Sequence, residues 1–182
     1  MKFSLIYEAQ TVDASREGEH RVYDEMVEQC VLAEEMGFDV IWAVEHTALT
    51  NYAHMSAPES FLAFIAGRTR RIEIGHGVVC LPPAMNHPIK VAERIATLDL
   101  LSQGRLHFGV GKGGTQQESG AFGYDLDTPI GSMSVDRATF NAGDNVTVRR
   151  ECEGEDVEVL KPPELEFRRG RILLSAGYEW WQ

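Results

Sequence analysis

Cysteine is scarce in this sequence, and the three cysteines that occur, Cys30, Cys80 and Cys152, follow no regular spacing. An odd number of cysteines with no Cys-x-x-Cys pair and no Cys/His cluster argues against a disulfide framework and against a structural zinc site. We therefore expect no metal in the functional site. Cys80 is expected to be an inert core residue, because unpaired cysteines behave as small apolar side chains.

Long apolar runs and an excess of basic charge are also missing. No run approaches the roughly 18 apolar residues that a membrane-spanning helix needs, and the N-terminal segment MKFSLIYEAQ lacks the basic and apolar regions of a secretion signal. The 17 basic and 28 acidic residues give a net charge of −11. A nucleic-acid partner would require a basic face. We expect a cytoplasmic protein that contacts neither membranes nor nucleic acid.

Apolar runs that are typical of buried strands alternate with amphipathic segments that are typical of helices. The expected strands are 2–7, 39–44, 72–81 and 105–110, and the expected helices are 21–36, 56–70 and 88–102. This alternation predicts successive βα units and a parallel sheet. A doubly wound sheet and a (β/α)8 barrel share the pattern, and periodicity alone does not separate them.

Local signals mark the ends of the expected helices. Gly37 is expected to end the first helix in the left-handed conformation. Ser56 with Glu59 has the spacing of a capping box, and Pro58 suits the first turn of that helix. Asn86 or His87 is a candidate N-cap for the helix that begins at Pro88.

The C-terminal part departs from this pattern. Residues 146–148 and 157–159 alternate apolar and polar side chains on both sides of an acidic turn, which predicts a β-hairpin. Residues 171–174 predict one more strand. We therefore divide the chain into 1–128, with its βα units, and 129–182, a β-rich tail of the same domain.

Two loops that follow expected strands contain residues suited to chemistry. His46 beside Glu45 could act as an acid or base near neutral pH, although such a pair is also common on surfaces. Gly109 to Gly114, with Lys112, reads GVGKGG. It lacks the spacing of a phosphate loop, no helix with Ser or Thr is expected to open there, and it does not match the dinucleotide fingerprint. Its backbone amides and cation nevertheless suit an anion.

About two thirds of the chain resembles one known family, the bacterial luciferase-like, flavin-dependent monooxygenases. The matching segments are IWAVEHT (41–47), APESFLAFIAGRTRRIEIGHGVVCLP (57–82), NHPIKVAERIATLDLLSQGRLHFGVGKGG (86–114) and FGYD (122–125). The resemblance implies a TIM-barrel type (β/α)8 fold. A complete barrel needs about 250 residues, so this chain would be an incomplete barrel of four to five βα units. RILLSAG, from Arg171, would be the fifth strand.

The resemblance also implies the site residues. His46 matches the catalytic histidine, next to Glu45, and Thr47 stands where many members have a second histidine. The peptide between Gly77 and Val78 matches a non-prolyl cis bond that backs the flavin ring; alternatively, Gly77 only relieves crowding inside the barrel.

Further matches imply how the cofactor is held. Asn86 and His87 belong to a loop that lies against the flavin. Lys112, with Gly111 and Gly113, matches the segment whose basic residue meets the flavin phosphate. Ser175 is a candidate remnant of the phosphate site that later strands complete.

The activity that the resemblance implies is a monooxygenase reaction on a small organic substrate, with O2 and with reduced FMN supplied by a separate flavin reductase. The deazaflavin F420 is the alternative cofactor. A non-catalytic flavin-binding relative and a partial barrel that needs a partner are the alternative functions. The unpaired edges of an incomplete barrel predict a homodimer or heterodimer. Trp180 and Trp181 are either anchors of that contact or part of a frayed tail.

Overall fold

The structure is a computed structural model of the chain. It describes residues 1–50, 52–82, 84–111 and 113–123 in full, and beyond residue 123 it describes the backbones of six short strands. Trp180, Trp181 and the segment 157–159 lie outside the described residues. None of the described helices is both long and apolar enough to cross a bilayer.

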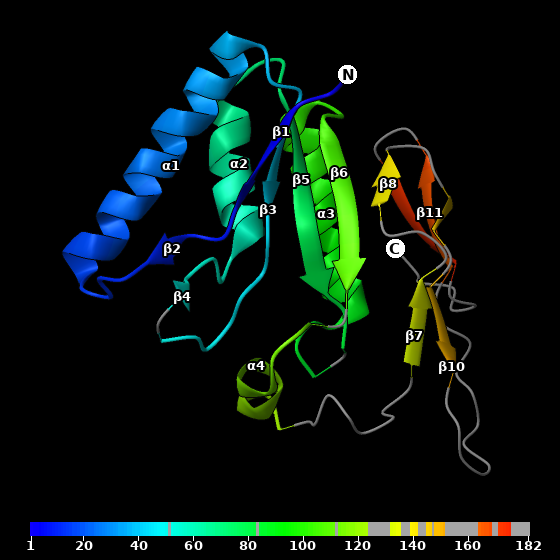
Figure 1. Cartoon of the computed structure of the whole chain (residues 1–182). Coiled ribbons are helices and arrows are strands. Elements are labelled where there is room, and N and C mark those ends of the chain that lie inside the picture. Colours follow the sequence, from blue (N-terminus) through cyan, green and yellow to red (C-terminus); the bar gives the residue numbers. More distant parts are fainter. Residues whose placement is uncertain are drawn as a thin grey trace.

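A five-stranded sheet in the order β1-β3-β5-β6-β8 forms the centre of the molecule (Figure 1). Its four parallel strands are β1 (Ser4–Tyr7), β3 (Val40–Ala43), β5 (Glu73–Cys80) and β6 (Leu106–Gly111). The fifth strand, β8 (Thr139–Asn141), pairs antiparallel with β6. The sequence prediction of four successive parallel strands is confirmed.

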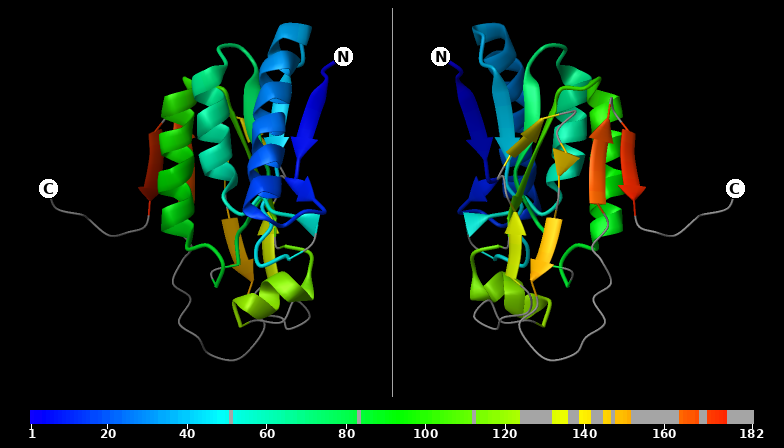
Figure 2. Two further views of the ribbon diagram at one scale, coloured as in Figure 1. Left: turned by 90° about the vertical axis from the view of Figure 1, so that its left-hand side faces the viewer. Right: turned by 90° about the vertical axis from the view of Figure 1, so that its right-hand side faces the viewer.

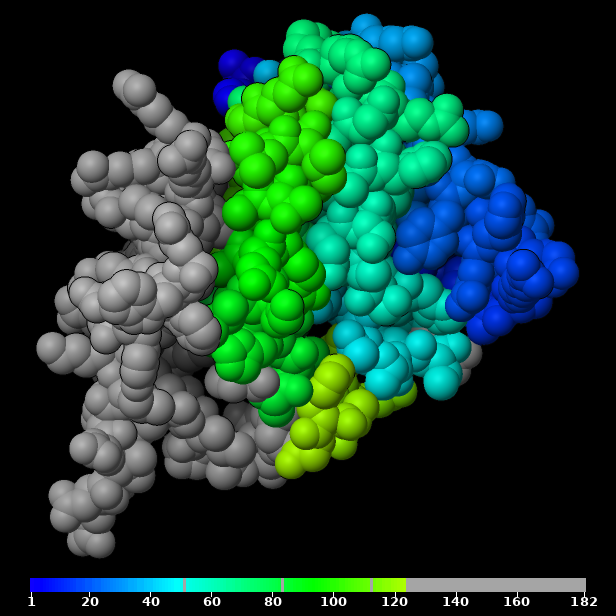
Figure 3. Space-filling model, turned by 180° about the vertical axis from the view of Figure 1, so that it is seen from behind, coloured from blue at the N-terminus to red at the C-terminus, as the bar shows by residue number. Residues whose placement is uncertain are grey.

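Three helices cover one face of this sheet. They are α1 (Arg16–Met36), α2 (Pro58–Arg68) and α3 (Pro88–Ser102), and Figure 3 shows them side by side from behind. The core lies between them and the strands. Its members with the least exposure include Ile41, Leu62, Ile65, Ile74 and Ile95. Each parallel strand is joined to the next by a helix, as the βα prediction requires.

The helix ends agree with the sequence only in part. Gly37 ends α1 with φ 88°, and His87 caps α3, as expected. The capping-box prediction for α2 is wrong: Ala57 is the N-cap and makes no side-chain hydrogen bond. The N–H of Ser56 bonds instead to the carbonyl of His54, which places Ser56 in the preceding turn.

The first helix begins earlier than predicted. Residues 16–20 were expected to belong to a loop, but α1 starts at Arg16. The Ser15 hydroxyl accepts a hydrogen bond from the N–H of Gly18 at 3.1 Å, which satisfies a free amide of the first turn. This turn has no large apolar side chain, so a search for apolar residues at helical spacing does not detect it.

Two short elements in the loops were not predicted. β2 (Gln10–Thr11) and β4 (Tyr52–Ala53) pair antiparallel and join the loop after β1 to the loop after β3. α4 (Gln116–Ala121) opens after the glycine-rich segment, capped by the Thr115 hydroxyl. The expectation that no helix with Ser or Thr follows that segment is therefore wrong.

The hairpin predicted between 146–148 and 157–159 is not tested, because its second arm lies outside the described residues. Within the described strands, β10 (Val148–Glu151) pairs antiparallel with β7 (Ser132–Val135), a strand earlier in the chain.

The strand predicted at residues 171–174 is confirmed as β12 (Arg171–Ser175), but it is not a fifth parallel barrel strand. It pairs antiparallel with β11 (Glu164–Arg168), which also pairs with β9 (Asn145–Val146). β12 lies beside α3 (Figure 2). A parallel strand needs a long crossover connection, whereas residues 169 and 170 alone separate β11 from β12.

Candidate functional site

The loops that follow β3, β5 and β6 gather at one edge of the sheet, the lower edge in Figure 1. These are the carboxyl ends of parallel strands, where α/β folds place their ligands. The loops contain His46, Asn86 and the glycine-rich segment, in that order along the chain. The edge therefore brings together the segments that the sequence singled out, and we call it the rim.

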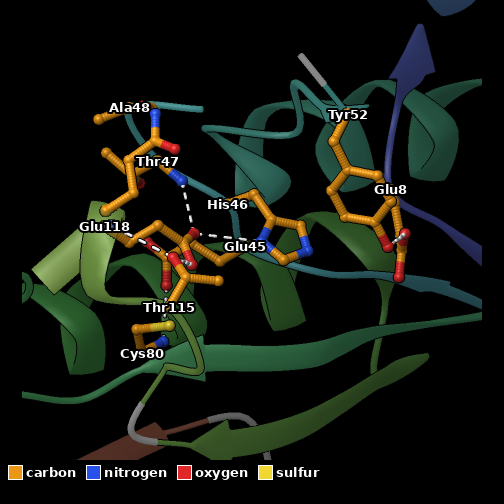
Figure 4. Close-up of polar contacts among 10 residues, drawn as sticks. Glu8, Glu45, His46, Thr47, Ala48, Tyr52, Cys80, Thr115 and Glu118 are labelled. Atoms are coloured by element: carbon orange, nitrogen blue, oxygen red, sulfur yellow. Dashed lines mark hydrogen bonds and ion pairs between the residues drawn. The ribbon is translucent and has the colours of Figure 1, made fainter. Parts of the chain in front are cut away.

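His46 is paired with a carboxylate far away in the sequence. Its Nδ1 atom lies 3.1 Å from Oε1 of Glu118, on α4. The same carboxylate accepts hydrogen bonds from the N–H of Thr47 at 2.9 Å and from the Thr115 hydroxyl at 2.7 Å. The Glu118 side chain is 4% exposed and that of His46 is 20% exposed, so the pair is largely shielded from water (Figure 4).

The surroundings of Glu118 decide which nitrogen of His46 carries the proton. Burial raises the pKa of Glu118, but the hydrogen bonds from Thr115, Thr47 and His46 outweigh it and lower the pKa. An ionised carboxylate only accepts hydrogen bonds. Nδ1 of His46 must therefore donate, which leaves Nε2 as the ring atom that can exchange a proton with a ligand.

Tyr52 bounds the other side of His46. The two rings meet edge to face with their centroids 5.8 Å apart, and Figure 4 shows His46 between Glu118 and Tyr52. The Tyr52 hydroxyl donates to Glu8 at 2.6 Å, and Gln10 binds the same carboxylate oxygen at 2.7 Å. The ends of β1, β3 and β6 thus jointly fix the orientation of the His46 ring.

Glu45, the neighbour of His46, supports the rim from within. Its two carboxylate oxygens accept hydrogen bonds from the N–H of Cys80 at 2.6 Å and from the Asn86 amide at 2.9 Å. Asn86 also donates to the Cys80 carbonyl at 2.8 Å, and its Oδ1 accepts from Arg94 at 2.6 Å. Arg94 in turn pairs with Glu59 at 2.6 Å.

These contacts define the role of Asn86 in the structure. The side chain is buried, and both donors of its amide are used inside the protein. Asn86 thus holds the loop between β5 and α3 against Glu45. His87, by contrast, is exposed; its Nδ1 accepts a hydrogen bond from the N–H of Ile89 at 3.3 Å as the cap of α3.

The glycine positions lie at the ends of β5 and β6. Gly111 is the last residue of β6, and its carbonyl accepts a hydrogen bond from Leu81 at 2.8 Å. Gly113 has φ 85°, a left-handed conformation that favours glycine. Lys112, between them, lies outside the described residues. The described pairing of β12 places Ser175 in the small β9-β11-β12 sheet, apart from the main sheet.

The cis peptide that the resemblance implied at Gly77 and Val78 is not present. No cis bond occurs among the described residues, which include both. Instead the ladder pairs His76 with Phe108 and then Val79 with Val110, so that two residues of β5 face one residue of β6. This is a β-bulge, which re-aims a strand end while keeping the trans peptide that is favoured energetically.

Sequence reasoning missed Glu118 and Tyr52. A local signal existed for the first: Thr115-x-x-Glu118 has the capping-box spacing, and Glu118 donates its own N–H to the Thr115 hydroxyl at 3.2 Å. No local pattern shows that α4 folds back onto His46. Cys80 is buried as expected, and burial raises the pKa of its thiol to about 12, which keeps it unreactive.

A comparison with protein families now adds to this geometry. The model described as luciferase-like monooxygenase matches residues 1–134. The chain belongs to the luciferase-like monooxygenase family. The family resemblance of the sequence is thus confirmed, and it covers β1 to β6, α4 and the His46–Glu118 pair.

Characterised relatives match the same part of the chain. The oxygenase component of a flavin-dependent trigonelline monooxygenase from Acinetobacter baylyi is 35% identical over 113 residues, which are 62% of this chain and 30% of the relative. Limonene 1,2-monooxygenase from Rhodococcus erythropolis is 38% identical over 118 residues, or 62% and 29%. This luciferase-like chain therefore spans about 30% of the length of the relatives it matches.

Solved structures agree on the fold. A monooxygenase from Streptomyces bottropensis superposes with a TM-score of 0.62 at 36% identity, covering 70% of this chain and 38% of the other. The oxygenating constituent of 3,6-diketocamphane monooxygenase from Pseudomonas putida, solved with FMN, gives 0.62 at 25% identity, covering 69% and 33%. The α/β TIM-barrel type that was expected is confirmed, and this luciferase-like chain holds part of such a barrel.

Proposed function

We propose that this chain forms the catalytic rim of a flavin-dependent monooxygenase that uses reduced FMN and O2 on a small organic substrate. The observation that carries the proposal is the hydrogen bond between His46 and Glu118, which fixes a histidine at the carboxyl ends of the parallel strands. Similarity to FMN-binding and monooxygenase relatives supports the same reading. The proposal concerns the activity of full-length luciferase-like proteins, of whose length this chain spans about 30%.

The residues at the rim suit a flat cofactor. Gly77 within β5, and Gly111 and Gly113 at the end of β6, place backbone rather than side chains near the rim, and a Cβ at Gly111 would lie 3.2 Å from Val78. We assign Gly77, Val78 and the glycine-rich segment to the cofactor ring, with His87 beside them. Lys112 is proposed for the phosphate group; the pairing of β12 in a separate sheet gives no support to Ser175, the other candidate for that group. When bound, reduced flavin supplies the two electrons that activate O2.

His46 has the geometry for proton transfer in this reaction. Glu118 holds a proton on Nδ1 and stabilises the charged ring when Nε2 also takes a proton. Nε2 can then donate to an oxygen atom that gains negative charge, or accept a proton from the substrate. Glu45 supports this arrangement by holding the end of β5 and the loop at Asn86.

The partners follow from the same assignment. A separate flavin reductase would supply reduced FMN, consistent with the relative that is described as an oxygenase component. Deazaflavin F420 is the alternative cofactor, since an F420-dependent secondary alcohol dehydrogenase shares the fold at 25% identity and a TM-score of 0.51. We further propose that a homodimer or heterodimer covers the open edges of the partial barrel.

The experiment is NAD(P)H-driven O2 consumption by the chain with a flavin reductase and FMN. His46→Ala should remove the part of the rate that depends on the chain, whereas His20→Ala, at an exposed histidine of α1, should leave it unchanged. FMN binding without turnover would favour a non-catalytic flavin-binding relative. Absence of both would favour a partial barrel that needs a partner.

A further inference from the structure

A polar side chain without a hydrogen-bond partner lies in the core directly behind the rim. His76, on β5, is 1% exposed, and its ring meets Phe108 edge to face at 6.1 Å. Among the residues that the structure describes, neither Nδ1 nor Nε2 of His76 has a hydrogen-bond partner. Leaving such groups unpaired in the core costs about 1–3 kcal/mol each, so their surroundings show what can satisfy them.

The ring borders a small cavity between β5, α2 and α3. Its lining residues are Glu45, Pro58, Glu59, His76, Val79, Val91, Arg94 and Ile95. Its volume of about 10 Å3 matches the space that one water molecule requires. Half of the lining residues carry polar or charged groups, which is the second condition for a bound water, because a wholly apolar cavity of this size would stay dry.

The charged residues around the cavity belong to the network that holds the rim. Arg94 bonds to Glu59 and Asn86, and Asn86 bonds to Glu45. Burial lowers the pKa of His76 to about 4, so the ring is neutral near pH 7 and has one N–H donor and one acceptor nitrogen. A water molecule in the cavity can accept a hydrogen bond from that N–H and donate one to a carboxylate of the lining. Among the described residues, no protein group makes a hydrogen bond to either ring nitrogen of His76.

We propose that this cavity binds one water molecule that joins His76 to the Glu45–Asn86–Arg94–Glu59 network, and that His76 is a positioning residue for the rim. The water carries the hydrogen bond from His76 to the network that fixes the N–H of Cys80 and the loop at Asn86. The positioning role of His76 rests on the proposed function, in which the rim is the cofactor site. The water site stands independently of it.

The test is NMR spectroscopy of the whole chain with 15N-labelled histidine. A ring N–H of His76 should exchange slowly with solvent and show a cross-peak to a long-lived bound water. His76→Phe, which keeps an aromatic ring without nitrogens, should remove that signal. If it fails to fold, His76→Asn should fold with a polar atom in the cavity and retain a bound water. A fast-exchanging ring N–H, or one without a water cross-peak, overturns the water site.

The positioning role of His76 is tested by the NMR signals of two groups, which can be measured without an activity assay. The N–H of Cys80 and the side-chain amide of Asn86 should shift and exchange faster, by about fivefold, when the hydrogen bond from His76 is lost. Ile95→Val is the matched control, because Ile95 lines the same cavity with no polar atom, is not a chain neighbour of Cys80 or Asn86, and should leave both signals in place. Unchanged signals in His76→Phe overturn the positioning role. FMN titration of the same variants reports separately on the proposed function.

Discussion

His46 and Glu118 are 72 positions apart in the sequence, yet Nδ1 of the histidine lies 3.1 Å from a carboxylate oxygen of the glutamate. The loop after β3 supplies the first residue, and α4, after β6, supplies the second. Because Glu118 also binds the backbone N–H of Thr47, it fixes both the ring of His46 and the chain that bears it. The two residues thus meet because β3 and β6 lie in one sheet, and not because of a local sequence motif.

Glu118→Gln should impair catalysis without unfolding the chain. The new amide can donate to Nδ1 of His46, which would reverse the tautomer and move the ring proton to Nε2. We expect a decrease of at least about 10-fold, and up to about 10⁴-fold, in the chain-dependent rate of O2 consumption, because an amide in place of the carboxylate that orients a reacting imidazole leaves the ring in the wrong tautomer. Glu118→Asp keeps the negative charge and should recover part of the rate. A rate for Glu118→Gln within twofold of the unmodified chain would refute the role given to Glu118.

Acid should destabilise the fold partly through His76. Burial lowers its pKa from 6.5 to about 4, assisted by the charge of Arg94 and opposed by that of Glu59. Between these two pH values the unfolded chain binds a proton that the folded chain does not, so stability falls as the pH falls from 6.5 towards 4. The full contribution is roughly 3 kcal/mol.

Urea unfolding at several pH values measures this effect. His76→Phe should flatten the decline in unfolding free energy between pH 6.5 and 4, and His20→Ala, at an exposed position, should not. A decline of equal slope in His76→Phe would show that other groups dominate acid unfolding.

Arg105→Lys should lower the free energy of unfolding by weakening the edge of the sheet opposite the rim. The guanidinium donates to the carbonyls of Ser102, Ile72 and Ala66 at 2.8, 2.8 and 2.9 Å, which joins the ends of α3 and α2 to the start of β5. Lysine lacks the planar fork and cannot reach all three acceptors, so we expect a loss of about 2 kcal/mol. Chemical denaturation should show the loss, while Arg21→Lys, in an exposed pair, should change stability by less than about 0.5 kcal/mol.

Two glycine-to-alanine substitutions should change stability in opposite directions. At Gly67, in α2, a Cβ would meet no atom within 4 Å, so Gly67→Ala should stabilise the helix by about 0.5–1 kcal/mol. At Gly75, a Cβ would lie 2.5 Å from the Trp42 ring and 3.1 Å from Cβ of His107. Gly75→Ala should cost about 1–3 kcal/mol, because the ring must move in a packed interior. Thermal unfolding of both variants checks the signs.

The sequence predicted those parts of the fold that depend on local pattern. The four parallel strands and α3 were found because their apolar residues recur at strand or helix spacing, and Gly37 ends α1 because a left-handed residue is needed there. The family resemblance then placed His46 at a functional rim. What it implied for the peptide after Gly77 was wrong, since a bulge in trans geometry takes its place.

Long-range pairing accounts for most of what the sequence did not predict. The ribbon between β2 and β4 joins loops of few residues, and neither segment has a periodicity to detect. Glu118 reaches His46 only because β3 and β6 lie in one sheet. The network around Asn86 likewise depends on Arg94, in the second turn of α3. In the tail, the strand predicted at 171–174 is present as β12, but its partner is set by long-range contacts that the alternation of apolar and polar residues does not encode.

The central claim is that the rim around His46 binds a flavin, and FMN titration of the whole chain tests it most directly. Flavin fluorescence and the visible spectrum should show saturable binding with one FMN per chain, and light scattering on the same sample gives the mass of the complex. FMN should bind more tightly than riboflavin, because Lys112 and the glycine-rich segment are assigned to the phosphate. Saturable binding of this kind is the predicted result. No saturation at high micromolar FMN would contradict the assignment of the rim as a flavin site.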